Sequence, residues 1–117
     1  MKTKIYADGS DIAVIEHLYN NCPYIDGFTT NPTLMRKSGI VDYLPFARKI
    51  LNVVKDKPIS FEVFADDFSE MERQALILHN LSPNVYVKIP VMNTKKQNSY
   101  DLVSSLSKGG VKVNVTA

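Results

Sequence analysis

The chain has 117 residues, which is enough for one domain with a substantial core. A net charge of +2 is too small to predict a nucleic-acid or membrane partner. The one cysteine, Cys22, excludes an internal disulfide, and the absence of a long apolar run or signal-peptide pattern predicts a cytoplasmic protein.

Strands and helices are predicted to alternate along the whole chain. The predicted strands are rich in β-branched and aromatic residues, and the predicted helices carry apolar residues at helical spacing. In chain order we expect a strand at 3–8, a helix at 11–20, a strand at 25–30, a helix at 42–55, a strand at 58–64, a helix at 70–81, a strand at 84–89, a helix at 98–108 and a strand at 111–116. This alternation favours parallel strands joined by crossover helices in a single domain, residues 1–117.

Two helix ends carry explicit signals. Ser69 and Glu72 have the spacing of a capping box, which predicts the start of the third helix. The Gly109-Gly110 pair predicts the end of the fourth helix.

Two architectures fit the alternation, an open doubly wound sheet and a (β/α)8 barrel. An open sheet is complete with five strands, whereas a barrel needs eight units and about 250 residues. Length alone therefore favours the open sheet.

The predicted strands carry a second, more polar face. In the strand at 84–89 the two valines and the isoleucine share one face, while Tyr86 and Lys88 share the other. Three further strands divide in the same way, so helices can pack on one face while the other is free for a ligand.

Polar side chains also fall at or just past the C-terminal ends of all five strands. They are Asp8, Asn31, Glu62, Lys88 and Thr116. Ligands bind at the C-terminal ends of the strands in parallel α/β folds, so these residues form a predicted active site.

Each of these residues also has a structural interpretation. Asp8 could cap the following helix or turn, and Asn31, in an Asn-Pro pair, could open a turn. Glu62 and Lys88 could form a buried structural ion pair, and Thr116 is an ordinary strand residue. The joint pattern favours a catalytic role.

The lysine suggests the reaction. Removing a lysine ammonium from water favours the neutral amine, which can attack a carbonyl and form a Schiff base. The iminium draws electrons from an adjacent C–C bond, which can then break. Glu62 and a threonine hydroxyl can hold a water for proton transfer, and Asp8 can accept a proton from a substrate hydroxyl. This is the chemistry of a class I aldolase or transaldolase, and it uses no metal or cofactor.

Four segments resemble the successive strand-end motifs of the transaldolase family. They are GFTTNPTLMRKSGI (27–40), ISFEVFADD (59–67), NVYVKIPV (84–91) and KVNVTA (112–117). The resemblance spans the chain in the right order, and TTNPT together with VKIP is highly specific. It implies a (β/α)8 TIM barrel, of which this chain holds about the first five strands and four helices.

The resemblance also implies roles for the polar residues. Lys88 matches the Schiff-base lysine, Asp8 the acid/base of C–C cleavage, and Glu62 the glutamate that works with a catalytic water. Thr116 matches the threonine that positions this water. Within TTNPT, Asn31 matches the asparagine that binds substrate hydroxyls, and its neighbour Thr30 is assigned to substrate binding as well.

The implied activity is transfer of a dihydroxyacetone unit between sugar phosphates in the pentose phosphate pathway. Related fructose 6-phosphate aldolases typically carry glutamine at the position of Glu62, so the glutamate favours a transaldolase. ADGSD, where DTA is more usual, and EVFADD and VMNT suggest a divergent subgroup. The expected partners are small sugar phosphates and further copies of the chain, with no nucleic acid and no membrane.

A chain that stops at the fifth strand lacks the later loops that hold the family's phosphate-binding arginine and serine. Three hypotheses follow: a fragment of a transaldolase-like enzyme, a half barrel that self-associates, or a non-enzymatic sugar-phosphate binding module. We favour the first.

Overall fold

The computed structural model describes residues 4–9, 12–30 and 44–116. Within them the predicted alternation of strands and helices is confirmed. The elements are β1 (Tyr6–Gly9), α1 (Ile12–Asn21), β2 (Gly27–Thr30), the helical residues 44–53, β3 (Ile59–Glu62), α3 (Phe68–His79), β4 (Val85–Pro90), α4 (Tyr100–Lys108) and β5 (Val113–Thr116).

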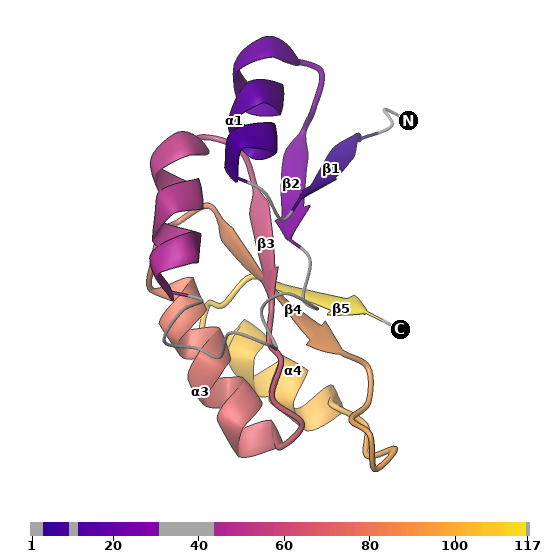
Figure 1. Cartoon of the computed structure of the whole chain (residues 1–117). Coiled ribbons are helices and arrows are strands. Elements are labelled where there is room, and N and C mark those ends of the chain that lie inside the picture. The colour runs from indigo at the N-terminus through magenta and orange to yellow at the C-terminus, as the bar shows by residue number, and fades with distance from the viewer. Residues whose placement is uncertain (1–3, 10–11, 31–43, 117) are drawn as a thin grey trace.

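The strand order decides between the two architectures that the sequence allows. The five strands are parallel and neighbour one another in chain order, β1-β2-β3-β4-β5, and the described helices lie on one side of the sheet (Figure 1). A doubly wound sheet reverses its strand order at a switch point and carries helices on both faces. The order seen here, with one helical layer, is that of a partial (β/α)8 barrel, so the open sheet favoured by length alone is wrong.

The core lies between the sheet and the helical layer. Val85, Val87 and Ile89 of β4 are almost fully buried, while the residues that alternate with them are only half-buried. Phe61 of β3 and Leu78 of α3 belong to the same cluster. Burying one such side chain stabilises a fold by about 1.5–3 kcal/mol. The predicted apolar face of the sheet is therefore the face that holds the helices.

Polar contacts fasten the end of the sheet where the strands begin. Asn84 donates to two main-chain carbonyls before β3, at 3.0 and 2.9 Å, and Lys57 Nζ donates to the carbonyl of Ile25 at 2.6 Å. The Tyr19 hydroxyl donates to Asp56, and this hydrogen bond raises the pKa of Tyr19 above its usual value. In parallel barrels this end serves stability rather than chemistry.

One predicted helix start is wrong. Asp67, rather than Ser69, is the N-cap of α3, and its carboxylate accepts the N–H of Glu70 at 3.3 Å. Aspartate is as good an N-cap as serine, and the earlier start brings Phe68 into contact with the core. The predicted end of α4 is confirmed, with Gly109 as the C-cap. No helix among the described ranges is long and apolar enough to cross a membrane.

Candidate active site

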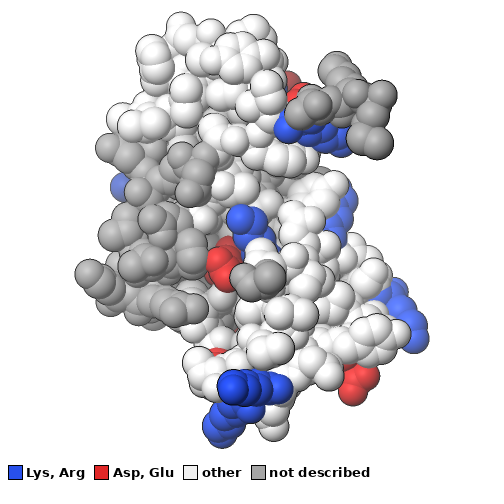
Figure 2. Space-filling view, turned by 90° about the vertical axis from the view of Figure 1, so that its right-hand side faces the viewer, with Lys and Arg blue, Asp and Glu red and all other residues white. Residues whose placement is uncertain are grey.

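Lys88 and Glu62 lie directly opposite each other on neighbouring strands. The register of β3 and β4 pairs Glu62 with Lys88, and that of β4 and β5 pairs Lys88 with Asn114. The alternation of β4 places Lys88 on the side of the sheet away from the helices, because its neighbours Val87 and Ile89 are buried on the helical side. On the face shown in Figure 2, blue and red atoms meet near the middle of a mostly uncharged described surface.

A hollow of about 460 Å³ is lined by Lys88 but not by Glu62. Hydroxyl, amide and ammonium groups from all five strands or their approaches line it, together with two tyrosine rings and a proline. Its lining residues are Lys4, Tyr6, Thr29, Pro58, Ser60, Tyr86, Lys88, Asn114 and Val115. Many polar groups around an amine suit a small, hydroxyl-rich ligand better than an apolar one.

Two other predicted site residues lie in the rows beside Lys88. The backbone register pairs Asp8 with Thr29, in the row that continues through Ser60 to Tyr86, two residues nearer the strand beginnings than Lys88. Thr116 pairs with Pro90, two residues nearer the strand ends than Lys88, and is half-buried. Three alternate rows of the sheet thus carry the aspartate, the glutamate–lysine pair and the threonine.

The two residues assigned to substrate binding are not placed at the hollow. Thr30 is 2% exposed, and its hydroxyl donates to the main-chain carbonyl of Ser60 at 3.1 Å. It alternates with Thr29 and shares the side of Phe28, which packs in the core. Asn31 lies outside the described residues. Their contact with substrate stays a prediction.

A second lysine on the inner side of the sheet is held away from Lys88. Lys112 Nζ donates to the carbonyl of Pro83, before β4, at 2.8 Å, and lies 5.5 Å from the centre of the Tyr86 ring. The Pro83 carbonyl and the Tyr86 ring hold the Lys112 ammonium near the beginnings of the strands.

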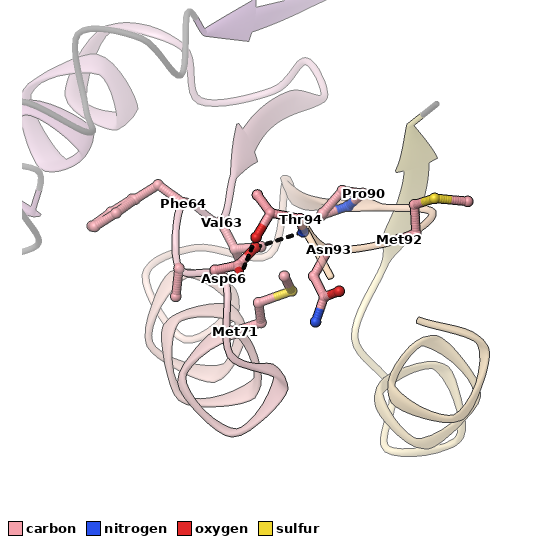
Figure 3. A pocket seen from close by; sticks show the side chains of 9 residues that line it. Val63, Phe64, Asp66, Met71, Pro90, Met92, Asn93 and Thr94 are labelled. Carbon is pink, nitrogen blue, oxygen red and sulfur yellow. Dashed lines mark hydrogen bonds between the residues drawn. The ribbon is translucent and has the colours of Figure 1, made fainter. Parts of the chain in front are cut away.

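The loops after β3 and β4 are joined at the end of the sheet where Lys88 lies. Asp66, after β3, accepts hydrogen bonds from the main-chain N–H and the hydroxyl of Thr94 at 2.8 and 2.6 Å (Figure 3). The buried Asn93 accepts from the N–H groups of Lys95 and Gln97, both at 3.0 Å. A smaller pocket of about 310 Å³ lies between the loops, with Met71 on its floor. These bonds give the mouth of the barrel a defined shape.

Of the nine residues that line the hollow, only Lys88 was a predicted site residue, and four of the others that carry polar groups are Thr29, Ser60, Tyr86 and Asn114. The signal that finds three of them is the two-residue period of the strands, because Ser60, Tyr86 and Asn114 share their faces with Glu62, Lys88 and Thr116. Ser60 and Tyr86 lie two residues nearer the strand beginnings than Lys88, whereas Asn114 lies opposite Lys88. A search limited to the last residues of the strands overlooks them.

The family is decided by comparison with known proteins. The family model described as Transaldolase/Fructose-6-phosphate aldolase matches residues 5–117. This chain belongs to that family. Its VKIP lysine and FEVF glutamate are the residues that face each other across β3 and β4.

Similar proteins from bacteria and archaea are described as probable transaldolases. A protein described as a probable transaldolase from Dehalococcoides mccartyi is 39% identical over 92 residues, covering 79% of this chain and 41% of that protein. Probable transaldolases from Brucella anthropi and Methanococcus maripaludis are 34% and 39% identical over 113 residues, covering 97% of this chain and 49% of each protein. The chain thus spans about half the length of these relatives, or less.

Proposed function

We propose that this chain carries the Schiff-base centre of a transaldolase, an enzyme that transfers a dihydroxyacetone unit between sugar phosphates. The observation that supports it most directly is the pairing of Lys88 with Glu62 across β3 and β4, with Lys88 lining a polar hollow on the barrel side of the sheet. A lysine amine facing a carboxylate is the arrangement that covalent catalysis at a ketone needs.

The proposed reaction begins at Lys88. Its free amine adds to the ketone of the donor, and loss of water leaves an iminium. Asp8 takes the proton of the hydroxyl on the far carbon, the C–C bond breaks, and its electrons pass into the iminium to form an enamine. The aldehyde product then departs.

The second half of the reaction returns Lys88 to its starting state. The enamine adds to the acceptor aldehyde, whose oxygen takes up a proton, and water then releases the new ketose from the lysine. Glu62 and Thr116 hold the water that carries these protons, and Asn31 and Thr30 bind substrate hydroxyls. No metal or cofactor takes part in this proposal.

A fructose 6-phosphate aldolase is the second candidate, because the family description covers both activities. In an aldolase the enamine is protonated and dihydroxyacetone is released, whereas a transaldolase passes it to an acceptor. Glu62 favours the transaldolase. The setting we propose is the pentose phosphate pathway in the cytoplasm, with sugar phosphates as partners, a homo-oligomeric assembly, and neither nucleic acid nor membrane involved.

Trapping the intermediate tests the proposal. The protein is incubated with dihydroxyacetone or fructose 6-phosphate, reduced with borohydride and digested, and the peptides are weighed by mass spectrometry. We expect one reduced three-carbon adduct, on Lys88, which Lys88→Met abolishes. Adding an acceptor aldehyde before the borohydride should remove the adduct if the protein is a transferase.

Lys4→Met and Lys112→Met are the matched controls, because both lysines lie on the same side of the sheet. Both variants should keep the adduct. Wild-type protein without any adduct would reject the Schiff-base proposal and favour a binding module without catalysis. An adduct that survives Lys88→Met would reject Lys88 as the nucleophile.

A further inference from the structure

One hydrogen bond crosses the strand that carries Lys88. The side-chain amide of Asn114 on β5 donates to the hydroxyl of Ser60 on β3 at 3.3 Å. In the sheet β4 lies between these two strands, so the bond joins strands that are not neighbours. We call it the Ser60–Asn114 bridge.

The register fixes where the bridge crosses β4. Ser60 is paired with Tyr86 and Asn114 with Lys88, and all four residues line the hollow. The bridge therefore runs diagonally over β4, between the side chains of Tyr86 and Lys88. It lies on the side of Lys88 that faces the beginnings of the strands.

The bridge depends on the curvature of the sheet. Neighbouring strands are about 4.8 Å apart, so strands two places apart in a flat sheet are separated by about 9.6 Å. Serine and asparagine are short, and their side chains meet only because the sheet curves toward the hollow. The bridge is thus a direct product of the barrel geometry.

Ser60 is held from both sides. Its side chain is in the bridge, it is only 7% exposed, and on the opposite side of β3 its carbonyl accepts the hydroxyl of the buried Thr30 at 3.1 Å. A buried serine fixed in this way gives Asn114, which is exposed, a rigid partner.

We propose that Ser60 is a positioning residue for Lys88 and acts through the bridge. This rests on the proposed function, in which Lys88 is the nucleophile. A lysine side chain is among those with the most rotamer freedom to lose, and forming a Schiff base removes much of it. The bridge prevents the lysine stem from folding back over Tyr86, so the amine stays near Glu62, which lies directly opposite, and Thr116, which lies nearer the strand ends.

The first test measures the rate of borohydride-trapped adduct formation against dihydroxyacetone concentration. We expect Ser60→Ala to lower the maximal rate about tenfold and to leave the half-saturating concentration within about twofold, because geometry rather than substrate contact is lost. Ser60→Thr, which keeps a hydroxyl, should recover most of the rate. A Ser60→Ala rate within about twofold of wild type, or no recovery with threonine, overturns the proposal.

A double-mutant cycle separates action through the bridge from an independent effect. If Ser60 acts through Asn114, the Ser60→Ala/Asn114→Ala double variant should be no slower than Asn114→Ala alone. Rate losses that multiply would show that Ser60 acts without the bridge and would overturn the proposal. Ser104→Ala on α4, on the helical side of the sheet, is the control and should keep the wild-type rate.

A second measurement is independent of the sugar chemistry. Formaldehyde condenses with a lysine amine, losing water, and cyanoborohydride reduces the iminium, so the extent of methylation reports how each lysine is presented. The ratio of Lys88 to the exposed Lys108 should fall at least about twofold in Ser60→Ala and stay constant in Ser104→Ala. If wild type forms no dihydroxyacetone adduct, the proposed function fails, but this ratio still decides the inference: equal ratios in wild type and Ser60→Ala overturn it.

Discussion

Gly27 on β2 is closely approached by the side chain of Tyr6, beside the hollow. A Cβ at this position would lie 2.4 Å from Tyr6 Cε1 and 2.8 Å from the carbonyl oxygen of Pro58. The tyrosine ring can turn away, but the carbonyl cannot, because it accepts the N–H of Phe28 at 2.9 Å. We expect Gly27→Ala to lower the free energy of unfolding by about 1–3 kcal/mol, measured by urea denaturation.

Gly109, the C-cap of α4, is the matched glycine. A Cβ there would meet its nearest atoms at 3.5 Å, an ordinary contact, and its backbone is not in the left-handed region. Gly109→Ala should therefore leave the free energy of unfolding unchanged or raise it by up to about 1 kcal/mol. Equal losses in the two variants would contradict the steric explanation for Gly27.

Single residues of the site differ in how far sequence alone predicts them. Lys88 and Glu62 are predictable because charged residues at the ends of apolar strands are unusual, and parallel pairing brings strand ends together. The contacts of Ser60 were not predictable, because they are a bond to the non-neighbouring strand β5 and a bond from the Thr30 side chain of β2 to the Ser60 main chain. The first of these requires the sheet curvature, which no local pattern encodes.

At the scale of elements, Gln74 fastens α3 to the chain leaving β3. It is 4% exposed, and its side-chain oxygen accepts the N–H groups of Phe64 and Ala65 at 3.1 and 3.2 Å. These residues lie two and three positions after Glu62, so the bonds hold the chain just past the strand end that carries the carboxylate. Gln74→Leu leaves both N–H groups without this acceptor and should destabilise the fold by about 2–4 kcal/mol in urea denaturation.

Arg73 is the neighbouring control on the same helix. It forms a salt bridge of 2.9 Å with Glu70, but both side chains are about half exposed. Exposed pairs of this kind contribute little, so Arg73→Met should change the free energy of unfolding by no more than about 0.5 kcal/mol. If Arg73→Met lowered the free energy of unfolding as much as Gln74→Leu, the loss would not be specific to Gln74 and its hydrogen bonds.

The elements themselves were largely predictable. All five strands and all four helices lie within a few residues of their predicted places, because alternating and helical periods are local properties of sequence. The start of α3 was missed since Asp67 and Ser69 are equally good caps and tertiary packing of Phe68 chose between them.

At the scale of the whole molecule, the order of the strands was beyond the reach of periodicity. Alternation of strands and helices is the same in a doubly wound sheet and in a barrel, and only the family resemblance favoured the barrel. The two folds differ in where the strand after each helix joins the sheet, and this depends on contacts between residues far apart in the sequence. The sequential order then places every strand end at one rim and leaves the opposite side of the sheet free of described helices.

That arrangement has a consequence for the two outer strands. Within the described part of the chain β1 and β5 each pair on one side only, and Val115 of β5 is 53% exposed although its strand neighbour Val113 packs against the core. An unpaired strand edge with an exposed valine is a template for another strand. This supports the proposed self-association.

We therefore expect the average mass in sedimentation equilibrium to rise with protein concentration, and Val115→Lys to weaken association at least about tenfold, because a charge on an edge strand opposes pairing. Val14→Lys is the control, since Val14 is similarly exposed but lies on the helix α1 rather than on β5. It should associate like wild type. A wild-type mass that stays at that of one chain at every concentration would reject the homo-oligomer. If Val115→Lys and Val14→Lys weakened association equally, the contact would not be at the edge of β5.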